Sequence, residues 1–203
     1  MRKIELIRSY YLPRIGKDSE DYKILGWEDK KSQILRFKAF ISNIDIKKYK
    51  SFFDVGCGVG TILDFFKDNG INLDYTGVDI LPEMIDIAKL KRPGYEFLHM
   101  NVFDNKEFKR NFDIVYCSGI FNINLGNNVI FLENAIKRTL DFNPSILGFN
   151  LLHYKSPNKE PGYFYFSPEE TIRIIEKIDF RLKKIKIIEG YLDNDFTIIC
   201  EKG

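Results

Sequence analysis

Cysteine and histidine are both scarce in this 203-residue sequence, which contains three cysteines and two histidines. Cys57, Cys117 and Cys200 lie far apart, and no pair of them has the spacing of metal ligands. The histidines, His99 and His153, are equally isolated from each other. We therefore expect no metal site in this protein, and none of the three cysteines has the surroundings expected of a nucleophile.

Excess charge of one sign is also missing. The formal net charge is +2, from 31 basic and 29 acidic residues that are spread along the chain. Nucleic-acid binders usually display a basic stripe, so we expect no nucleic-acid partner. No apolar stretch has membrane-spanning length, and the first residues lack a signal-peptide pattern. A cytoplasmic protein without membrane contact is the default expectation.

Neither a linker nor an internal repeat interrupts the chain. Its length lies within the range that one α/β domain fills, and its 44% hydrophobic content is ordinary for a globular core. Segments typical of strands alternate with segments typical of helices up to the last residues. The sequence therefore predicts a single α/β domain.

The most informative segment joins a buried strand to a glycine-rich turn. An apolar run ends at Asp54, and Gly56, Gly58 and Gly60 follow at alternate positions before a run with helical apolar spacing. Glycine permits positive φ and lets a ligand approach the main chain closely. Free N–H groups at a helix start attract a polar or anionic ligand group. The segment predicts a ligand-binding turn, with a tight turn that binds nothing as the alternative.

Two nucleotide-cofactor folds use such a turn, and the glycine spacing separates them. The dinucleotide fingerprint is Gly-x-Gly-x-x-Gly, whereas this chain reads Asp-x-Gly-x-Gly-x-Gly from Asp54 and has Thr61 at the place of the last dinucleotide glycine. The pattern resembles the first motif of the class I S-adenosylmethionine (SAM) methyltransferases. This resemblance implies that Asp54, Gly56, Gly58 and Gly60 bind SAM and its product S-adenosylhomocysteine (SAH).

A second acidic residue follows about one strand later. Residues 73–79 have the character of a strand that ends at Asp79, where a carboxylate can accept two hydrogen bonds from a ribose diol. The alternative role for Asp79 is to cap the helix that begins near Pro82. The resemblance favours the ribose role, and it places Ile80 and Leu81 against the adenine.

The third strand, from residue 95, ends in a polar segment. The family usually has an acid there that binds the adenine amino group. Asn101 aligns better with that position, while Asp104 has the usual charge but lies further along. The resemblance also implies that the Val102 main chain faces the adenine ring. We expect His99, inside the strand pattern, to be structural.

The fourth strand, from residue 112, runs into a loop of small residues, and open α/β sheets bind ligands beyond the carboxyl ends of their strands. The resemblance places Ser118 and Gly119 beside the methionine part of SAM, and Phe121 and Asn122 in the acceptor pocket. A turn residue that binds its own main chain is the alternative for Asn122. Asp113, at the strand start, is expected to be structural.

The N-terminal part of the chain predicts a cover for the cofactor. Residues 27–44 carry apolar side chains at helical spacing and resemble the N-terminal element of a subset of small bacterial methyltransferases. There a basic side chain pairs with the methionine carboxylate, which makes Arg36 or Lys30 the candidate here, since arginine is better suited to a planar carboxylate. A solvated basic face is the alternative. Residues 1–26 are interpreted as a lid.

The C-terminal half predicts the acceptor side. A fifth strand at 145–152 is followed by His153 and Tyr154 at its carboxyl end. His153 is the candidate base because its intrinsic pKa is near neutral, and Tyr154 is a candidate for orienting the acceptor. Residues 155–167 are rich in turn-forming and aromatic residues, and a connection of that length indicates a substrate-binding insert.

Together these segments predict a three-layer Rossmann-like sandwich. Its sheet has seven mostly parallel strands, of which the last is antiparallel. A helix begins at Pro168 after an N-cap at Ser167, and two strands follow at 180–189 and 195–202. The expected units are a helical cap (1–45), a SAM-binding core (51–152), an acceptor-side insert (153–167) and a C-terminal helix with a strand pair (168–203).

The resemblance implies SAM-dependent methyl transfer. The absence of certain motifs limits which classes of methyl acceptor are expected. The chain lacks the Asp/Asn-Pro-Pro-Tyr/Phe run of amino-directed DNA and RNA methyltransferases, and it has no cysteine where cytosine-C5 enzymes keep their nucleophile. We therefore expect an oxygen or nitrogen of a small molecule to be methylated by a monomer or homodimer. A SAM-binding regulatory protein without activity and a nicotinamide-dependent oxidoreductase are the alternatives.

Overall fold

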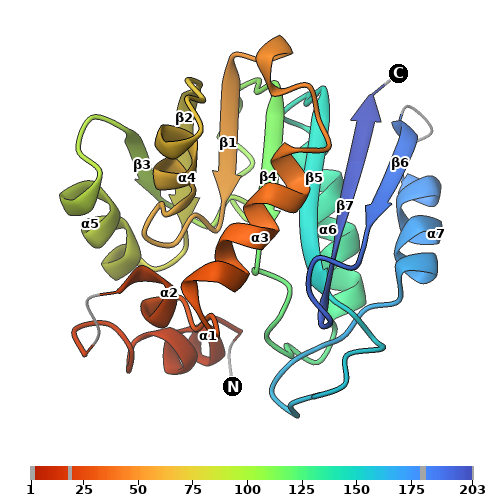
Figure 1. The fold of residues 1–203 in the computed structure, drawn as a ribbon, viewed down its shortest axis with the longest axis horizontal. Coiled ribbons are helices and arrows are strands. Elements are labelled where there is room, and N and C mark those ends of the chain that lie inside the picture. The colour runs from red at the N-terminus through yellow and green to blue at the C-terminus, as the bar shows by residue number, and fades with distance from the viewer. Residues whose placement is uncertain (1–2, 18–19, 179–181, 203) are drawn as a thin grey trace.

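A central seven-stranded sheet organises the computed structural model, which describes residues 3–17, 20–178 and 182–202 (Figure 1). The strands follow the order β3-β2-β1-β4-β5-β7-β6, and β7 is antiparallel to both of its neighbours while the other pairs are parallel. The predicted sandwich with an antiparallel last strand is confirmed. The strands are β1 (Ser51–Val55), β2 (Asp74–Asp79), β3 (Glu96–His99), β4 (Ile114–Ser118), β5 (Ile146–Leu152), β6 (Leu182–Ile188) and β7 (Asp195–Lys202).

Helices cover both faces of this sheet because successive side chains of a strand point to opposite sides. Phe52 of β1 packs with the helices on one face, and its neighbour Phe53 packs with those on the other. The first face carries α3 (Lys30–Ile41), α4 (Ile62–Asp68) and α5 (Pro82–Lys91), and the second carries α6 (Asn128–Leu140) and α7 (Pro168–Ile178). Both faces of the central strands are therefore buried, as is usual for parallel sheets.

Local capping sets where two of these helices begin. The helix predicted over 27–44 is shorter, at Lys30–Ile41, because the Asp29 side chain accepts a hydrogen bond from Ser32 N at 2.6 Å and caps its first turn. Ser167 has the same role for α7, where its Oγ accepts from Glu170 N at 3.3 Å. The predicted cap and helix start at 167–168 are thus confirmed.

The N-terminal residues form two helices at the carboxyl ends of the parallel strands, α1 (Lys3–Tyr11) and α2 (Asp21–Ile24) (Figure 1, bottom). Apolar side chains of α1 pack against α5 and the loop before it, and two ion pairs support them. Arg8 binds Glu83 at 2.7 Å, and Asp21 binds Arg92 at 2.5 Å. The segment interpreted as a lid therefore lies over the edge of the sheet where a ligand is expected.

The C-terminal strand pair completes the sheet, with β6 at its edge. Lys184 and Lys186 of β6 both bind Glu201 of β7, at 3.5 and 2.9 Å. Phe180, where the sequence predicts this strand to start, lies outside the described residues.

A single-turn 3-10 helix, η1 (Ile46–Lys48), precedes β1. Among the described residues, no helix combines the length and the apolar character needed to cross a membrane.

Helix α3 packs closely on the sheet at Gly148 of β5, where a Cβ would lie 2.0 Å from the ring of Phe40. Phe40 is fully buried and stacks on Tyr116 with 4.4 Å between ring centroids. A side chain at position 148 would overlap the Phe40 ring, so we expect Gly148→Ala to lower the free energy of unfolding by about 1–3 kcal/mol, measured by urea denaturation. Gly162→Ala is the matched control because open space surrounds that position, and an equal loss in both variants would contradict this account.

Candidate active site

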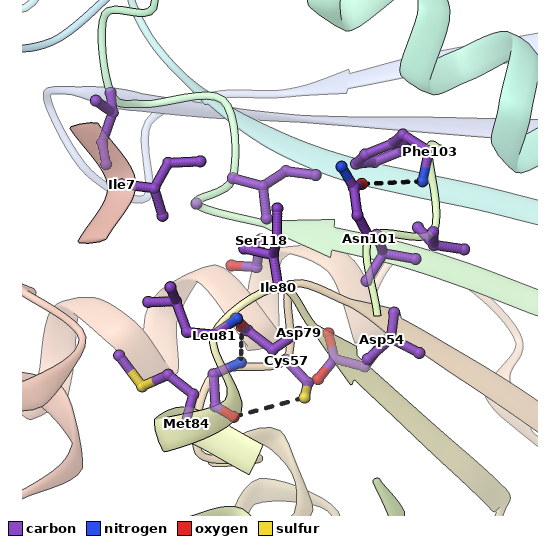
Figure 2. A pocket seen from close by; sticks show the side chains of 18 of the residues that line it. Ile7, Asp54, Cys57, Asp79, Ile80, Leu81, Met84, Asn101, Phe103 and Ser118 are labelled. Atoms are coloured by element: carbon purple, nitrogen blue, oxygen red, sulfur yellow. Dashed lines mark hydrogen bonds between the residues drawn. The ribbon is translucent and has the colours of Figure 1, made fainter. Parts of the chain in front are cut away.

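A cavity of about 1040 Å³ lies at the carboxyl ends of the parallel strands, beneath α1. Its walls come from the turn after β1, the ends of β2 and β4, the loop after β3, and α6. Figure 2 shows Asp54, Asp79, Asn101 and Ser118 around one part of it. The four polar segments that the sequence singled out therefore meet in one place.

The glycine turn forms the floor of this cavity. Gly56 and Gly58 have φ of +75° and +54°, as expected for a turn that needs positive φ, and both line the cavity. A Cβ at Gly58 would overlap the side chain of Leu25, which covers the turn from the N-terminal segment. The absence of a side chain at Gly58 therefore lets Leu25 pack directly on the main chain of the turn.

Gly60 has a different reason to be glycine. It also has positive φ, at +79°, but it does not line the cavity, and a Cβ there would lie 2.8 Å from the ring of Phe97. The structure therefore places Gly60 in the packing between the turn and β3. The expectation that it contacts the cofactor is not supported by its position.

Asp79 is held in place by the turn itself. One carboxylate oxygen accepts a hydrogen bond from Gly58 N, and the other accepts one from Leu81 N, both at 2.9 Å (Figure 2). Burial raises the pKa of Asp79, while the main-chain hydrogen bonds oppose that shift. Ile80 and Leu81 line the cavity next to it. The alternative role as the helix cap is not borne out, because the N-cap of α5 is Leu81 and that helix has no side-chain cap. The carboxylate instead forms part of the cavity wall.

Asp54 lies deeper, at the end of β1. Its carboxylate accepts a hydrogen bond from the Tyr75 hydroxyl at 2.9 Å. Burial raises the pKa of Asp54 to about 7, and the nearby negative charge of Asp79 adds to that rise. An acid with such a pKa changes its charge near neutral pH, beneath the glycine turn.

The loop after β3 brings both alternative polar residues to the cavity. Asn101 and Asp104 line it, and Asn101 Nδ2 donates to Asp104 Oδ2 at 2.6 Å. Asn101 Oδ1 accepts from Phe103 N at 3.2 Å (Figure 2). Val102, between them, is buried and also lines the cavity. The two candidates therefore form one hydrogen-bonded unit.

The loop after β4 is supported from behind by a buried polar chain. Ser118 and Gly119 line the cavity, and Gly119 N donates to Asn150 Oδ1 at 3.1 Å. Asn150 Nδ2 in turn donates to Asp195 at 3.2 Å, and Asp195 forms an ion pair with Arg36. This chain connects α3, β5 and β7 to the cavity wall.

Comparison with known proteins agrees with this geometry. A family model described as a methyltransferase domain matches residues 53–140. A curated relative, the putative methyltransferase Rv1506c of Mycobacterium tuberculosis, is 30% identical over an alignment of length 158 that covers 74% of this chain and 92% of the relative. The chain belongs to the class I SAM-dependent methyltransferases. The nicotinamide-dependent alternative is thereby discarded.

Solved structures with low sequence identity share the fold of this methyltransferase. The magnesium protoporphyrin IX methyltransferase of Synechocystis PCC 6803, with bound SAH, has a TM-score of 0.68 at 12% identity, covering 98% of this chain and 100% of that one. The PH0226 protein of Pyrococcus horikoshii OT3 has a TM-score of 0.66 at 14% identity, covering 96% and 99%. The fold therefore extends over nearly the whole chain.

The residues around the cavity fit SAM. Gly58 and Gly119 line the cavity without a Cβ, and the N-terminal segment packs closely on both: a Cβ would meet Leu25 at the first, and the Trp27 ring would be 2.9 Å from a Cβ on the second. The carboxylate of Asp79, to which the resemblance assigns the ribose, lies in the wall of the cavity. These residues, with Ile80, Leu81 and Val102, are those that would hold the cofactor of this methyltransferase.

Five of the predicted site residues do not line the cavity: Arg36, Gly60, Asn122, His153 and Tyr154. Arg36 is buried, binds Asp195, and lies over the Trp27 ring with 4.2 Å between its guanidinium carbon and the ring centroid. Its Nε and Nη1 have no hydrogen-bond partner in the part of the chain that the structure describes. Lys30, the other candidate, is exposed and also lies outside the cavity.

His153 is held away from the cavity by its own hydrogen bonds. Its Nε2 lies 2.8 Å from Glu189 Oε1, and its Nδ1 accepts from Lys155 N at 2.9 Å. The imidazole stacks on Tyr154, with 5.1 Å between ring centroids. The predicted place just past the carboxyl end of β5 is confirmed. The side chain is buried there with both ring nitrogens bonded, and it does not line the cavity.

The sequence interpretation missed most of the residues that roof the cavity. Ile4, Ile7 and Tyr11 of α1 line it, as do Leu25 and Trp27. The helical spacing of the first three was a usable pattern, but the short helix gave no indication of what it covers. The contribution of α6 was missed as well, although Asn127 at its start is a residue type that favours the N-cap position.

The raised pKa of Asp54 predicts how stability changes with pH. A group whose pKa is higher in the folded than in the unfolded chain contributes stability below its unfolded value, about 3.8, and that contribution is lost as pH rises through the folded value, about 7. Asp54→Asn, which keeps the shape and an acceptor for Tyr75, should therefore gain stability relative to the wild type over this range. The gain should be a few kcal/mol at most.

Urea unfolding at several pH values between these limits measures that difference. Asp74→Asn is the control, because Asp74 is exposed at the opposite end of β2. A difference between Asp54→Asn and wild type that does not vary with pH would contradict the assignment.

The position of His153 also makes a prediction. His153→Ala removes both hydrogen bonds of a buried ring, so we expect it to lower the free energy of unfolding by about 1–3 kcal/mol and to leave SAM affinity unchanged in calorimetry. If the variant instead kept its stability but lost roughly 10²–10⁴-fold in kcat, His153 would be the base that the sequence suggested.

Proposed function

We propose that this methyltransferase transfers the methyl group of SAM to an oxygen or nitrogen atom of a small molecule. The observation that carries the proposal is the continuity of the cavity. It begins at the glycine turn and Asp79 and continues without interruption to α6. At about 1040 Å³ it reaches the upper end of the range of roughly 300–1,000 Å³ for small-molecule pockets, so a second ligand has room beside the cofactor.

The roof of the cavity supports a small acceptor over a polymer. Ile4, Ile7 and Tyr11 of α1 lie above it and are only partly exposed. Arg8 and Asp21 anchor this N-terminal segment to Glu83 and Arg92. An acceptor that reaches the site beneath this cover has to be small enough to enter with the segment in place.

The chain contributes mainly positioning and exclusion of water. SAM supplies a methyl group that its sulfonium already activates, so alignment of the acceptor accounts for much of the rate. The fixed carboxylate of Asp79 and the bare main chain at Gly58 and Gly119 orient one ligand, while apolar side chains of α1 keep water out. Burial raises the pKa of Tyr11, which lines the cavity as a neutral hydroxyl.

Two measurements test the proposal. Calorimetry with SAM, SAH and NADH should show binding of the first two and none of NADH. SAH release in the presence of a panel of small-molecule acceptors then separates an enzyme from a regulatory SAM-binding protein. SAM binding without turnover on any member of a broad panel would favour the regulatory alternative.

Asp79 provides the sharpest single variant. If its carboxylate accepts hydrogen bonds from the ribose, Asp79→Ala should weaken SAM binding by about 1.5–3 kcal/mol, the range for a hydrogen bond to a charged group. Calorimetry on a variant shown to be folded by circular dichroism measures this. Asp74→Ala, at the exposed start of the same strand, is the matched control, and an Asp79→Ala protein with wild-type affinity would refute the ribose role.

A further inference from the structure

The end of the cavity that faces α6 differs in character from the end at the glycine turn. Its walls are largely apolar, with Ile7 from α1, Phe103 from the loop after β3, and Ile130 and Phe131 from α6. Figure 2 shows Ile7 and Phe103 on opposite sides of the drawn region. Ile130 has 56% of its surface exposed although it is a large apolar residue, so the cavity opens to solvent along an apolar rim.

Positive charge accompanies this apolar rim. Lys3, Lys106 and Lys137 line the same end and are exposed. Lys137 is paired with Glu133, and Lys3 lies 5.9 Å from the centroid of the Phe131 ring. Lys106 has no hydrogen bond or ion pair among the described residues.

The two acidic residues at this end have different partners. Asp104 accepts a hydrogen bond from Asn101, and Asp141 is paired with Arg138 at 3.1 Å. Arg138 itself is buried and donates to main-chain carbonyls, including that of Val102 at 3.0 Å. Asp104 keeps its negative charge because Asn101 is neutral. Among the described residues, the two cavity lysines without an ion pair, Lys3 and Lys106, outnumber it, so the balance of charge at this opening is positive.

We propose that the acceptor-side end of this cavity binds an amphiphilic anion: a molecule with an apolar body that lies between α1 and α6 and a carboxylate or similar anionic group that meets Lys106 at the rim. This inference rests on the proposed function, since it names the class of acceptor for the same site. An apolar body gains from burial in proportion to its area, and a cation at the rim discriminates between anionic, neutral and cationic molecules of equal length.

Three eight-carbon probes separate these contributions: octanoate, octanol and octyltrimethylammonium. Isothermal titration calorimetry on the SAH-loaded wild-type protein should show octanoate binding more tightly than octanol and octanol more tightly than the cation. Added salt should weaken octanoate binding only, because it screens exposed charges. Equal affinities for the three probes would overturn the proposal.

Two matched pairs of variants locate the site. Lys106→Ala should weaken octanoate binding about threefold to fivefold, as expected for an exposed charge, and leave octanol unchanged. Lys109→Ala, an exposed lysine three positions along that does not line the cavity, should have no effect. Ile130→Asn should weaken both probes, whereas Val129→Asn, an exposed neighbour outside the cavity, should weaken neither.

Other outcomes distinguish a failure of the amphiphile proposal from a failure of the proposed function. If SAH binds but neither Lys106→Ala nor Ile130→Asn changes octanoate affinity, the amphiphile proposal fails and the methyltransferase function stands. If octanoate binds as expected but no acceptor of any class is methylated, the proposed function fails and the binding site stands. Octanoate that fails to bind while the protein sediments with phosphatidylglycerol vesicles would overturn the proposal in favour of a membrane surface.

Discussion

The hydrogen bond from Gly58 N to the Asp79 carboxylate is the contact on which the site depends. It joins the turn after β1 to the end of β2, the two segments that the sequence predicts to bind the cofactor. Gly58 has a φ of +54°, which glycine adopts without strain. The same turn leaves its main chain open toward the N-terminal segment, whose Leu25 side chain rests directly above it. The glycine at position 58 therefore accounts both for the conformation of the turn and for its contacts with Asp79 and Leu25.

Those parts of the site that lie on consecutive segments could be predicted from the sequence. The strand that ends at Asp54, the turn glycines and the acid at position 79 form a local pattern, and parallel strands bring their carboxyl ends together by topology. Arg36 and His153 could not be placed in this way. Arg36 binds Asp195 and His153 binds Glu189, and both partners lie far along the chain. Pairing between distant segments leaves no periodic pattern in the sequence from which it could be predicted.

Gly60 shows how a correct motif can contain residues with different tasks. Two of the alternating glycines border the cavity, whereas the third makes room for the ring of Phe97. The sequence alone cannot distinguish these tasks, because glycine leaves room both for a ligand above the main chain and for a neighbouring side chain. The fold class is insensitive to this difference, since helix and strand periodicity depend on the apolar residues around the turn. Only the three-dimensional neighbours separate the two tasks.

The lysines of β6 give the sheet a definite boundary. Strand edges carry unpaired main-chain groups that invite another strand, and charged side chains are a common protection against this. Lys184 and Lys186 lie on this outermost strand, and both pair with Glu201 of the neighbouring strand β7. A second molecule that docked there edge to edge would bring two rows of ammonium groups together. Charge repulsion therefore disfavours extension of the sheet through β6.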